Sequence, residues 1–216
     1  MPTKEEHLQR IEACGIIGVI RAQSSAHLIS VATAIKEGGV DVIEVTMTTP
    51  DALEVIHSTS RQFGDAVLIG VGSVLDAETA RAAILAGAEY VVCPVFNPEV
   101  IAMAHRYSKP VMPGCLTPTE IINAWSAGAD MVKVFPATAL GPQYFKDVLG
   151  PLPHVKLVPT GGVDLDNAGD FIKAGAAALG VGGNLVDKRA VAEGRFEVVA
   201  ETASRFVEAV RAARGG

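Results

Sequence analysis

The sequence predicts an α/β fold in which eight parallel strands close into a (β/α)8 TIM barrel with an extra N-terminal helix. Eight short apolar runs alternate with segments of helical period along all 216 residues. The runs are almost wholly hydrophobic, which is typical of parallel strands covered on both faces. A weak internal repeat, about two strand–helix units long, favours a closed barrel over the alternative, an open doubly wound sheet.

The predicted strands follow the apolar runs in chain order. They are Ile16–Ile20, Val40–Val45, Val67–Val71, Tyr90–Val95, Pro110–Pro113, Met131–Phe135, Val155–Val158 and Ala178–Val181. Barrels of this class often exceed 200 residues as one unit, so we expect a single domain over residues 1–216.

Helix signals fill the segments between the predicted strands. The apolar period of a helix is carried by Leu28, Val31, Ala32 and Ile35. A capping residue precedes proline at Thr49-Pro50, Asn97-Pro98 and Thr117-Pro118. Thr117 and Glu120 match a capping box, and Asp76 and Asp164 are further candidate caps. Additional terminal helices are predicted over residues 3–13 and 188–213.

The internal repeat is a glycine that ends a helix just before each even-numbered strand. Its copies are Gly39-Val40-Asp41, Gly87-Ala88-Glu89, Gly128-Ala129-Asp130 and Gly175-Ala176-Ala177. Glycine suits the left-handed position at a helix end. The fifth residue after each repeat glycine is Glu44, Val92, Lys133 and Gly180 in turn. Because alternate strands fill one layer of a barrel, these four side chains should point inward at a similar height.

Glu44 and Lys133 would therefore be opposite charges inside an apolar barrel, which has a large desolvation cost. One interpretation is a buried ion pair with only a structural role. The other is catalytic, because the apolar stretch Met131–Pro136 favours the neutral, nucleophilic amine of Lys133. Glu44 would then be the neighbouring general acid and base.

Two glycine-rich loops form a second candidate site. Thr160-Gly161-Gly162-Val163 follows the seventh strand, and Gly180-Val181-Gly182-Gly183-Asn184 includes the end of the eighth. Loops seven and eight of such barrels often bind phosphate, because their backbone N–H groups lie at the catalytic end. The sequence therefore predicts a phosphate site there.

Composition excludes several other functions. The net charge of −6, without a basic tract, argues against nucleic acid and membrane surfaces as partners. The five histidines are scattered without ligand spacing, and no nucleotide motif is complete, so we expect neither metal nor cofactor.

Cys14, Cys93 and Cys115 form no C-x-x-C pair and fit free thiols in a reducing cytosol. The polar N-terminus does not resemble a signal peptide, and no apolar run is long enough to span a membrane.

Taken in order, the motifs resemble the 2-keto-3-deoxy-6-phosphogluconate (KDPG) aldolase family, which includes 4-hydroxy-2-oxoglutarate (KHG) and galactonate-derived aldolases. The resemblance covers roughly residues 15–190. It is carried by Gly18–Arg21, Gly38–Val40, Ile43–Thr46, Gly70–Val74, Pro113-Gly114, Val132–Ala137, Pro159–Gly162 and Gly182-Gly183.

The resemblance implies a class I aldolase that cleaves KDPG to pyruvate and glyceraldehyde 3-phosphate, with Lys133 as the Schiff-base lysine and Glu44 as the acid and base. It also implies a homotrimer that acts on small 2-oxo acids and aldehydes, and the unpaired cysteines predict a cytoplasmic protein. The alternatives are a related 2-oxo acid aldolase, for KHG or the phosphogalactonate analogue, and a non-catalytic sugar-phosphate-binding barrel.

Two positions depart from the family pattern. Thr48 stands where many relatives have an arginine that grips the substrate carboxylate, and Asn184 stands where a serine is common. Arg21, at the end of the first predicted strand, is our candidate for the missing positive charge. The full predicted substrate-binding set is Arg21, Thr48, Ser73, Pro94, Thr160, Gly161, Gly162, Gly182, Gly183 and Asn184.

Overall fold

The computed structural model describes residues 2–21 and 25–215 and has an α/β fold built on a curled parallel sheet. Its strands are β1 (Ile16–Ile20), β2 (Val42–Thr46), β3 (Leu68–Gly72), β4 (Val91–Val92), β5 (Val111–Met112), β6 (Gly114–Cys115), β7 (Val132–Val134), β8 (Leu157–Pro159) and β9 (Leu179–Val181). Its α-helices are α1 (Lys4–Cys14), α2 (Ser25–Glu37), α3 (Ala52–Phe63), α4 (Ala77–Ala86), α5 (Pro98–Arg106), α6 (Pro118–Ser126), α7 (Gly141–Leu149), α8 (Ala168–Lys173), α9 (Lys188–Ala192) and α10 (Phe196–Ala213). Short 3-10 segments are η1 (Gly64–Ala66) and η2 (Ala137–Ala139).

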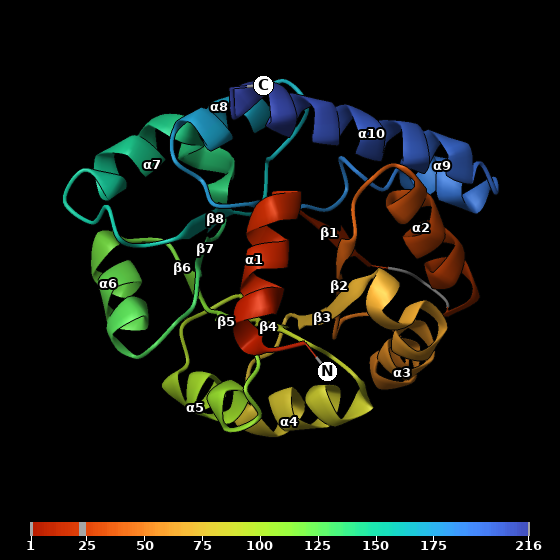
Figure 1. The fold of residues 1–216 in the computed structure, drawn as a ribbon, viewed down its shortest axis with the longest axis horizontal. Coiled ribbons are helices and arrows are strands. Elements are labelled where there is room, and N and C mark those ends of the chain that lie inside the picture. The colour runs from red at the N-terminus through yellow and green to blue at the C-terminus, as the bar shows by residue number, and fades with distance from the viewer. Residues whose placement is uncertain (1, 22–24, 216) are drawn as a thin grey trace.

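The strands follow one another in chain order around the curled sheet. One group has the order β5-β4-β3-β2-β1-β9 and the other the order β6-β7-β8, with parallel pairing throughout. Only Pro113 separates β5 from β6, and a bridge from Thr160 to Gly180 links the end of β8 to β9. Figure 1 shows the helices arranged around the strands.

Every predicted apolar run overlaps a strand, but several predicted bounds are wrong. The fifth run, Pro110–Pro113, contains only β5, and the sequence did not predict β6, which begins after Pro113, a residue with no N–H to donate to a sheet ladder. The strand predicted over Tyr90–Val95 is reduced to β4. The helix predicted over 188–213 is two helices, α9 and α10, because the chain turns at Gly194 with a φ of 72°.

The repeat glycines have the left-handed conformation that the sequence predicts. Their φ angles are 93° at Gly39, 117° at Gly87, 99° at Gly128 and 98° at Gly175. An L-residue with a Cβ rarely adopts such angles, so these positions favour glycine. Each turn directs the chain from a helix into the following strand.

The predicted helix caps are partly confirmed. Thr117 and Glu120 form the capping box of α6, and the side chains of Asn97 and Asp76 cap α5 and α4. Two predictions are wrong. The residue before α3 is Asp51 rather than Thr49. Asp164 accepts hydrogen bonds from backbone N–H groups in the turn before α8, while the residue before that helix is Asn167.

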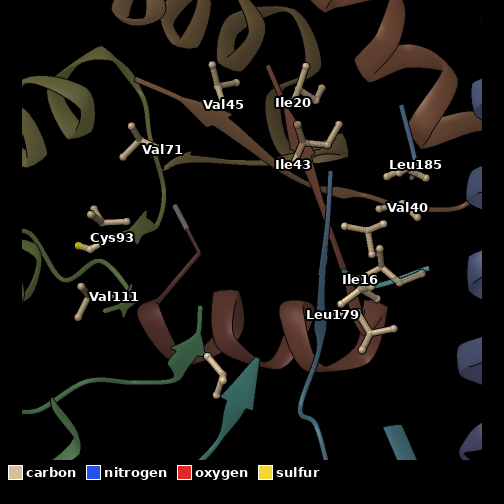
Figure 2. Close-up of a cluster of buried hydrophobic side chains, with 14 of the residues drawn as sticks. Ile16, Ile20, Val40, Ile43, Val45, Val71, Cys93, Val111, Leu179 and Leu185 are labelled. Atoms are coloured by element: carbon tan, nitrogen blue, oxygen red, sulfur yellow. The ribbon is translucent and has the colours of Figure 1, made fainter. Parts of the chain in front are cut away.

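Buried side chains form two separate layers, and the alternation of each strand assigns residues to one of them. The outer layer packs between strands and helices and includes Ile43 and Val45 of β2 (Figure 2). Val42 belongs instead to the inner layer. Because successive side chains of a strand point to opposite faces, Glu44 points inward with Val42. The same alternation directs Lys133 of β7 inward, since Val132 and Val134 belong to the outer layer.

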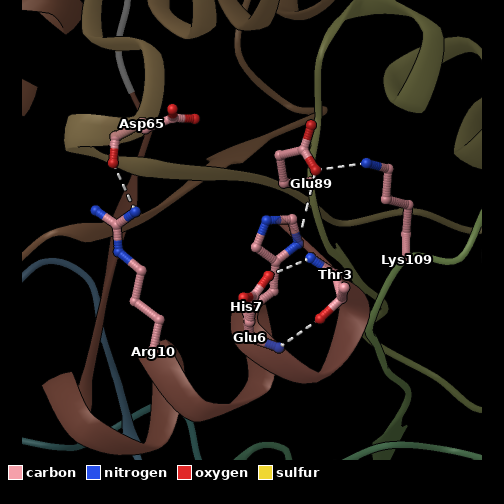
Figure 3. Close-up of polar contacts among 7 residues, drawn as sticks. All are labelled: Thr3, Glu6, His7, Arg10, Asp65, Glu89 and Lys109. Carbon is pink, nitrogen blue, oxygen red and sulfur yellow. Dashed lines mark hydrogen bonds and ion pairs between the residues drawn. The ribbon is translucent and has the colours of Figure 1, made fainter. Parts of the chain in front are cut away.

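Helix α1 covers the amino ends of the strands. Its Ile11 is fully buried against the inner layer. Arg10 Nε donates a hydrogen bond at 2.8 Å to Oδ2 of Asp41, a residue that lies just before β2. Arg10 Nη1 donates at 2.8 Å to the carbonyl of Asp65, which lies just before β3. His7 lies 3.6 Å from Glu89, just before β4, and Glu89 also pairs with Lys109 (Figure 3). These contacts close the amino end and leave the carboxyl ends of the strands for a site.

We predict that Gly38→Ala destabilises the fold by about 1–3 kcal/mol, the usual cost of overpacking. A Cβ at Gly38 would lie 2.4 Å from the Ala200 carbonyl oxygen and 2.5 Å from Ala203 Cβ, on helix α10. Urea unfolding would measure the change. Gly169→Ala is the control, because its Cβ would meet nothing closer than 3.7 Å and helix α8 favours alanine. Equal stability of the two variants would contradict this account of the packing.

Candidate active site

Glu44 and Lys133 are both buried on the inner face of the sheet. Glu44, in the middle of β2, is 2% exposed, and Lys133, in the middle of β7, is 6% exposed. Their positions follow from strand alternation, so the sequence prediction that both point inward is confirmed. Few charged side chains are this buried in proteins without a partner.

Two glycines of β3 provide the space that this arrangement needs. A Cβ at Gly72 would lie 1.7 Å from Glu44 Oε1, so no larger residue fits there without moving the carboxyl group. A Cβ at Gly70 would lie 2.3 Å from Cζ of Tyr90, which is fully buried in the inner layer. Glycine at these positions is therefore required by the neighbouring side chains rather than by a turn.

Burial raises the pKa of the Glu44 carboxyl above its ordinary value, while the positive charges of Lys133 and Arg21 oppose that rise. Glu44 Oε1 is buried and has no hydrogen-bond partner among the described residues. Within that part of the chain no ion pair joins Glu44 to Lys133, whose Nζ instead lies 4.9 Å from the centre of the Phe135 ring. The purely structural ion pair considered from the sequence is thus not formed. A raised pKa suits a carboxyl group that both accepts and returns a proton.

A cavity of about 350 Å³ opens where the chain leaves β1, β7, β8 and β9. It is lined by Val19, Arg21, Phe135, Thr160, Gly161, Gly162, Val163, Gly180, Gly182, Gly183, Asn184, Val186 and Lys188. Phe135 connects this cavity to Lys133, because its ring lines the cavity and lies next to the amine. The described lining residues include two cations, Arg21 and Lys188, and no acidic side chain.

One side-chain hydrogen bond holds the two glycine loops together, and another lies within the first loop. Gly161 and Gly162 have φ angles of 89° and 75°. Asn184 Nδ2 donates to the Val163 carbonyl at 2.8 Å, which ties the loop after β9 to the loop after β8. Asn167 Nδ2 donates to the Gly162 carbonyl at 2.8 Å. Asn184 therefore fixes the two loops relative to each other, a role that its place in the sequence does not reveal.

Three of the predicted substrate-binding residues do not line this cavity. Thr48 lines a neighbouring cavity of about 650 Å³, which shares Arg21 and Lys188 with the first. Its hydroxyl is 2.8 Å from that of the buried Thr46. Ser73 follows β3 with a φ of 60°, unusual for a residue with a side chain, and Pro94 follows β4. Their predicted part in substrate binding stays a prediction.

The sequence prediction missed Phe135 and Lys188 as cavity residues. Phe135 could have been found from its place two residues after Lys133, just beyond the end of β7. Lys188 was hidden because the residues from 188 onward read as one long surface helix. For metals, no cluster of three His, Cys, Asp or Glu side chains occurs among the described residues. Nor does any helix in the described part of the chain combine the length and apolarity needed to cross a membrane.

The family described as KDPG and KHG aldolase matches residues 8–202. A 2-dehydro-3-deoxy-phosphogluconate aldolase from Treponema pallidum (strain Nichols) is 35% identical over 212 residues, which cover 97% of this chain and 99% of that protein. A 2-dehydro-3-deoxy-6-phosphogalactonate aldolase from Escherichia coli (strain K12) is 34% identical over 199 residues, which cover 92% of this chain and 95% of that one.

A solved structure of similar fold is KDPG aldolase from Legionella pneumophila with pyruvate captured as a covalent carbinolamine intermediate. Its TM-score is 0.85 at 27% identity, and the match covers 91% of this chain and 96% of that one. The fold and the matches define the class as an aldolase, which is a carbon–carbon lyase. The chain belongs to the KDPG and KHG aldolase family, as its motifs predict.

We predict that Gly72→Ala impairs the site through Glu44, because the new methyl group would occupy the position of Glu44 Oε1. Turnover should fall at least as far as in Glu44→Gln, for which about 10²–10⁴-fold is expected of a lost acid–base group. The variant should also lose stability in urea unfolding.

A double-mutant cycle separates this effect from general damage to β3. Glu44→Ala removes the carboxyl group that the new methyl group would meet. In that background Gly72→Ala should lower the free energy of unfolding by at least about 1 kcal/mol less than it does in the parent chain. Simple additivity of the two changes would show that Gly72 acts independently of Glu44.

Proposed function

We propose that this chain is a class I aldolase that cleaves KDPG to pyruvate and glyceraldehyde 3-phosphate, with Lys133 as the nucleophile. The observation that carries the proposal is the burial of Lys133 and Glu44 on one inner face. Neither residue lines the cavity of the glycine loops, but Phe135, whose ring centre is 4.9 Å from Lys133 Nζ, does. An amine in apolar surroundings and a buried carboxyl group are the two groups that this chemistry needs. Membership of the aldolase family supports the same reaction.

The reaction proceeds through covalent intermediates on Lys133. The neutral amine attacks the C2 ketone, and loss of water gives an iminium that accepts the electron pair of the C3–C4 bond. Glu44, whose pKa burial raises, removes the proton of the C4 hydroxyl as that bond breaks and the aldehyde leaves. The remaining enamine takes a proton at C3, and water hydrolyses the pyruvate iminium to free Lys133. No step uses a metal or an organic cofactor.

The two anionic ends of the substrate are assigned to different parts of the site. The phosphate lies against the glycine loops, whose members Gly161, Gly162, Gly183 and Asn184 line one cavity. Arg21 supplies a positive charge for the substrate, in place of the family arginine that Thr48 replaces. In support, Arg21 lines both cavities and its charge acts on Glu44. Ser73, Pro94, Thr160 and Gly182 complete the binding set.

A second candidate substrate is the phosphogalactonate analogue, which differs from KDPG in configuration at C4. The aldolase from Escherichia coli named for it is 34% identical to this chain, close to the 35% of the Treponema pallidum protein. KHG, which carries no phosphate, is a weaker candidate, because the cationic cavity would have no phosphate to bind. Cleavage rates with both phosphorylated epimers would decide between the first two.

We also propose that the parallel strands complete a (β/α)8 barrel, preceded by α1, in a single domain over residues 1–216. The bridge between Thr160 and Gly180 and the chain continuity at Pro113 support closure. The homotrimer that the family resemblance implies and the cytoplasmic location that the unpaired cysteines predict stay predictions, which sedimentation and localisation would test.

Borohydride reduction in the presence of pyruvate should label Lys133 and no other lysine, because it alone lies buried in the middle of a described strand. Peptide mass analysis identifies the labelled residue, and Lys133→Arg is the control that should remain unlabelled. Labelling elsewhere, or none, would refute the Schiff-base assignment. A non-catalytic sugar-phosphate-binding barrel would additionally fail to exchange solvent deuterium into pyruvate.

Arg21→Ala should raise the Michaelis constant for the keto acid by an order of magnitude or more, because a hydrogen bond to a charged group contributes roughly 1.5–3 kcal/mol. Steady-state kinetics would measure it. Arg205→Ala is a matched control, since Arg205 is an exposed arginine of α10 that lines neither cavity. Unchanged kinetics for Arg21→Ala would mean that backbone amides and hydroxyls alone bind the anionic groups of the keto acid.

A further inference from the structure

We propose that Lys188 is a specificity-determining residue that makes this site prefer substrates with a terminal phosphate; this inference rests on the proposed function. Lys188 lines the cavity formed by the two glycine loops. It also lines the neighbouring cavity, so its side chain lies on the wall that the two share with Arg21. A phosphate bound on the glycine loops would therefore have this lysine beside it.

The electrostatic surroundings of Lys188 are selective for an anion. The chain carries a net charge of −6, yet neither cavity has an Asp or Glu among the described residues that line it. The Lys188 amine takes part in none of the ion pairs or hydrogen bonds of the described residues, whereas Lys4, Lys109 and Lys156 are each paired with a carboxylate. Lys188 is thus available to a ligand on the cavity side.

The backbone that carries Lys188 is fixed by its neighbours. Leu185 and Val186 donate backbone hydrogen bonds to the Gly182 carbonyl at 2.9 and 3.0 Å, and Leu185 is 1% exposed. Asp187 Oδ1 accepts from the Ala190 N–H at 2.7 Å, which starts α9 at Lys188. The acidic neighbour Asp187 is therefore engaged with the helix. The glycine loop and the lysine are parts of one anchored turn.

Backbone amides and a lysine make different contributions to phosphate recognition. Amides of the glycine loops orient the phosphate oxygens but carry only partial charges. A lysine acts as a full, mobile point charge, which suits the doubly charged phosphate. Without Lys188 the loops should still accept a neutral chain end, but the advantage of the phosphorylated substrate should shrink.

The test compares KDPG with its unphosphorylated analogue, 2-keto-3-deoxygluconate, in the full-length chain. Lys188→Met should lower kcat/KM for KDPG at least tenfold more than for the analogue, and Lys188→Arg should restore most of the preference. Lys173→Met is the matched control, because this exposed lysine ends α8, which runs back towards the amino ends of the strands. Equal losses on both substrates in Lys188→Met, or no loss, would overturn the proposal.

A binding measurement keeps the inference separate from the aldolase reaction. Inorganic phosphate, titrated by calorimetry, should bind the parent chain and Lys173→Met alike and bind Lys188→Met about tenfold more weakly. If cleavage is absent but this difference holds, the proposed function fails while Lys188 remains a phosphate residue. If phosphate binds the parent chain and Lys188→Met equally, or binds neither, the assignment of Lys188 is wrong.

Discussion

The burial of Glu44 and Lys133 is the constraint on which the rest of the structure depends. Each charge has a large desolvation cost, and no direct ion pair joins the two side chains, so the charges of Lys133 and Arg21 only partly offset the burial of Glu44 and packing holds both residues in place. Apolar neighbours on β2 and β7 fill the outer layer and leave only the inner direction for these two residues. Gly72 provides the volume that the carboxyl group occupies. Stability is thus given up locally to keep reactive groups in place.

Glycine has two distinct physical roles in this fold. At Gly39 and Gly128 it permits the left-handed turn that starts β2 and β7 at the correct residue, and this register determines that Glu44 and Lys133 point inward. At Gly70 and Gly72 its backbone angles are ordinary, and the absence of a Cβ is what matters. A substitution of the first kind would strain the backbone, while one of the second kind would displace a neighbouring side chain.

The α/β fold with parallel strands and the inward placement of Glu44 and Lys133 could be predicted from the sequence because they depend on periodic patterns. Apolar runs locate the strands, and the repeat glycines give the register that aligns Glu44 with Lys133. Loop residues follow no such period, so Thr48, Ser73 and Pro94 were assigned to the site without a pattern that fixes their position, and they lie outside the cavity of the glycine loops. Lys188 was missed because the sequence on both sides of the turn at Gly194 has a helical pattern, so α9 and α10 were predicted as one long helix. Hydrogen bonds between loops, such as the one from Asn184 to the Val163 carbonyl, depend on which loops lie next to each other in space, and a single sequence does not carry that information.

Helix α1 covers one end of the sheet and so assigns the proposed reaction to the other end. Ile11 and the contacts of Arg10 and His7 cover the amino end, so substrate and water approach the proposed site from the carboxyl ends of the strands. The cycle releases one water when the iminium forms and consumes another when it is hydrolysed. Both waters and the sugar acid use the carboxyl ends of the strands. A substitution among the loops at that end should therefore change the hydration of the site together with the binding of substrate.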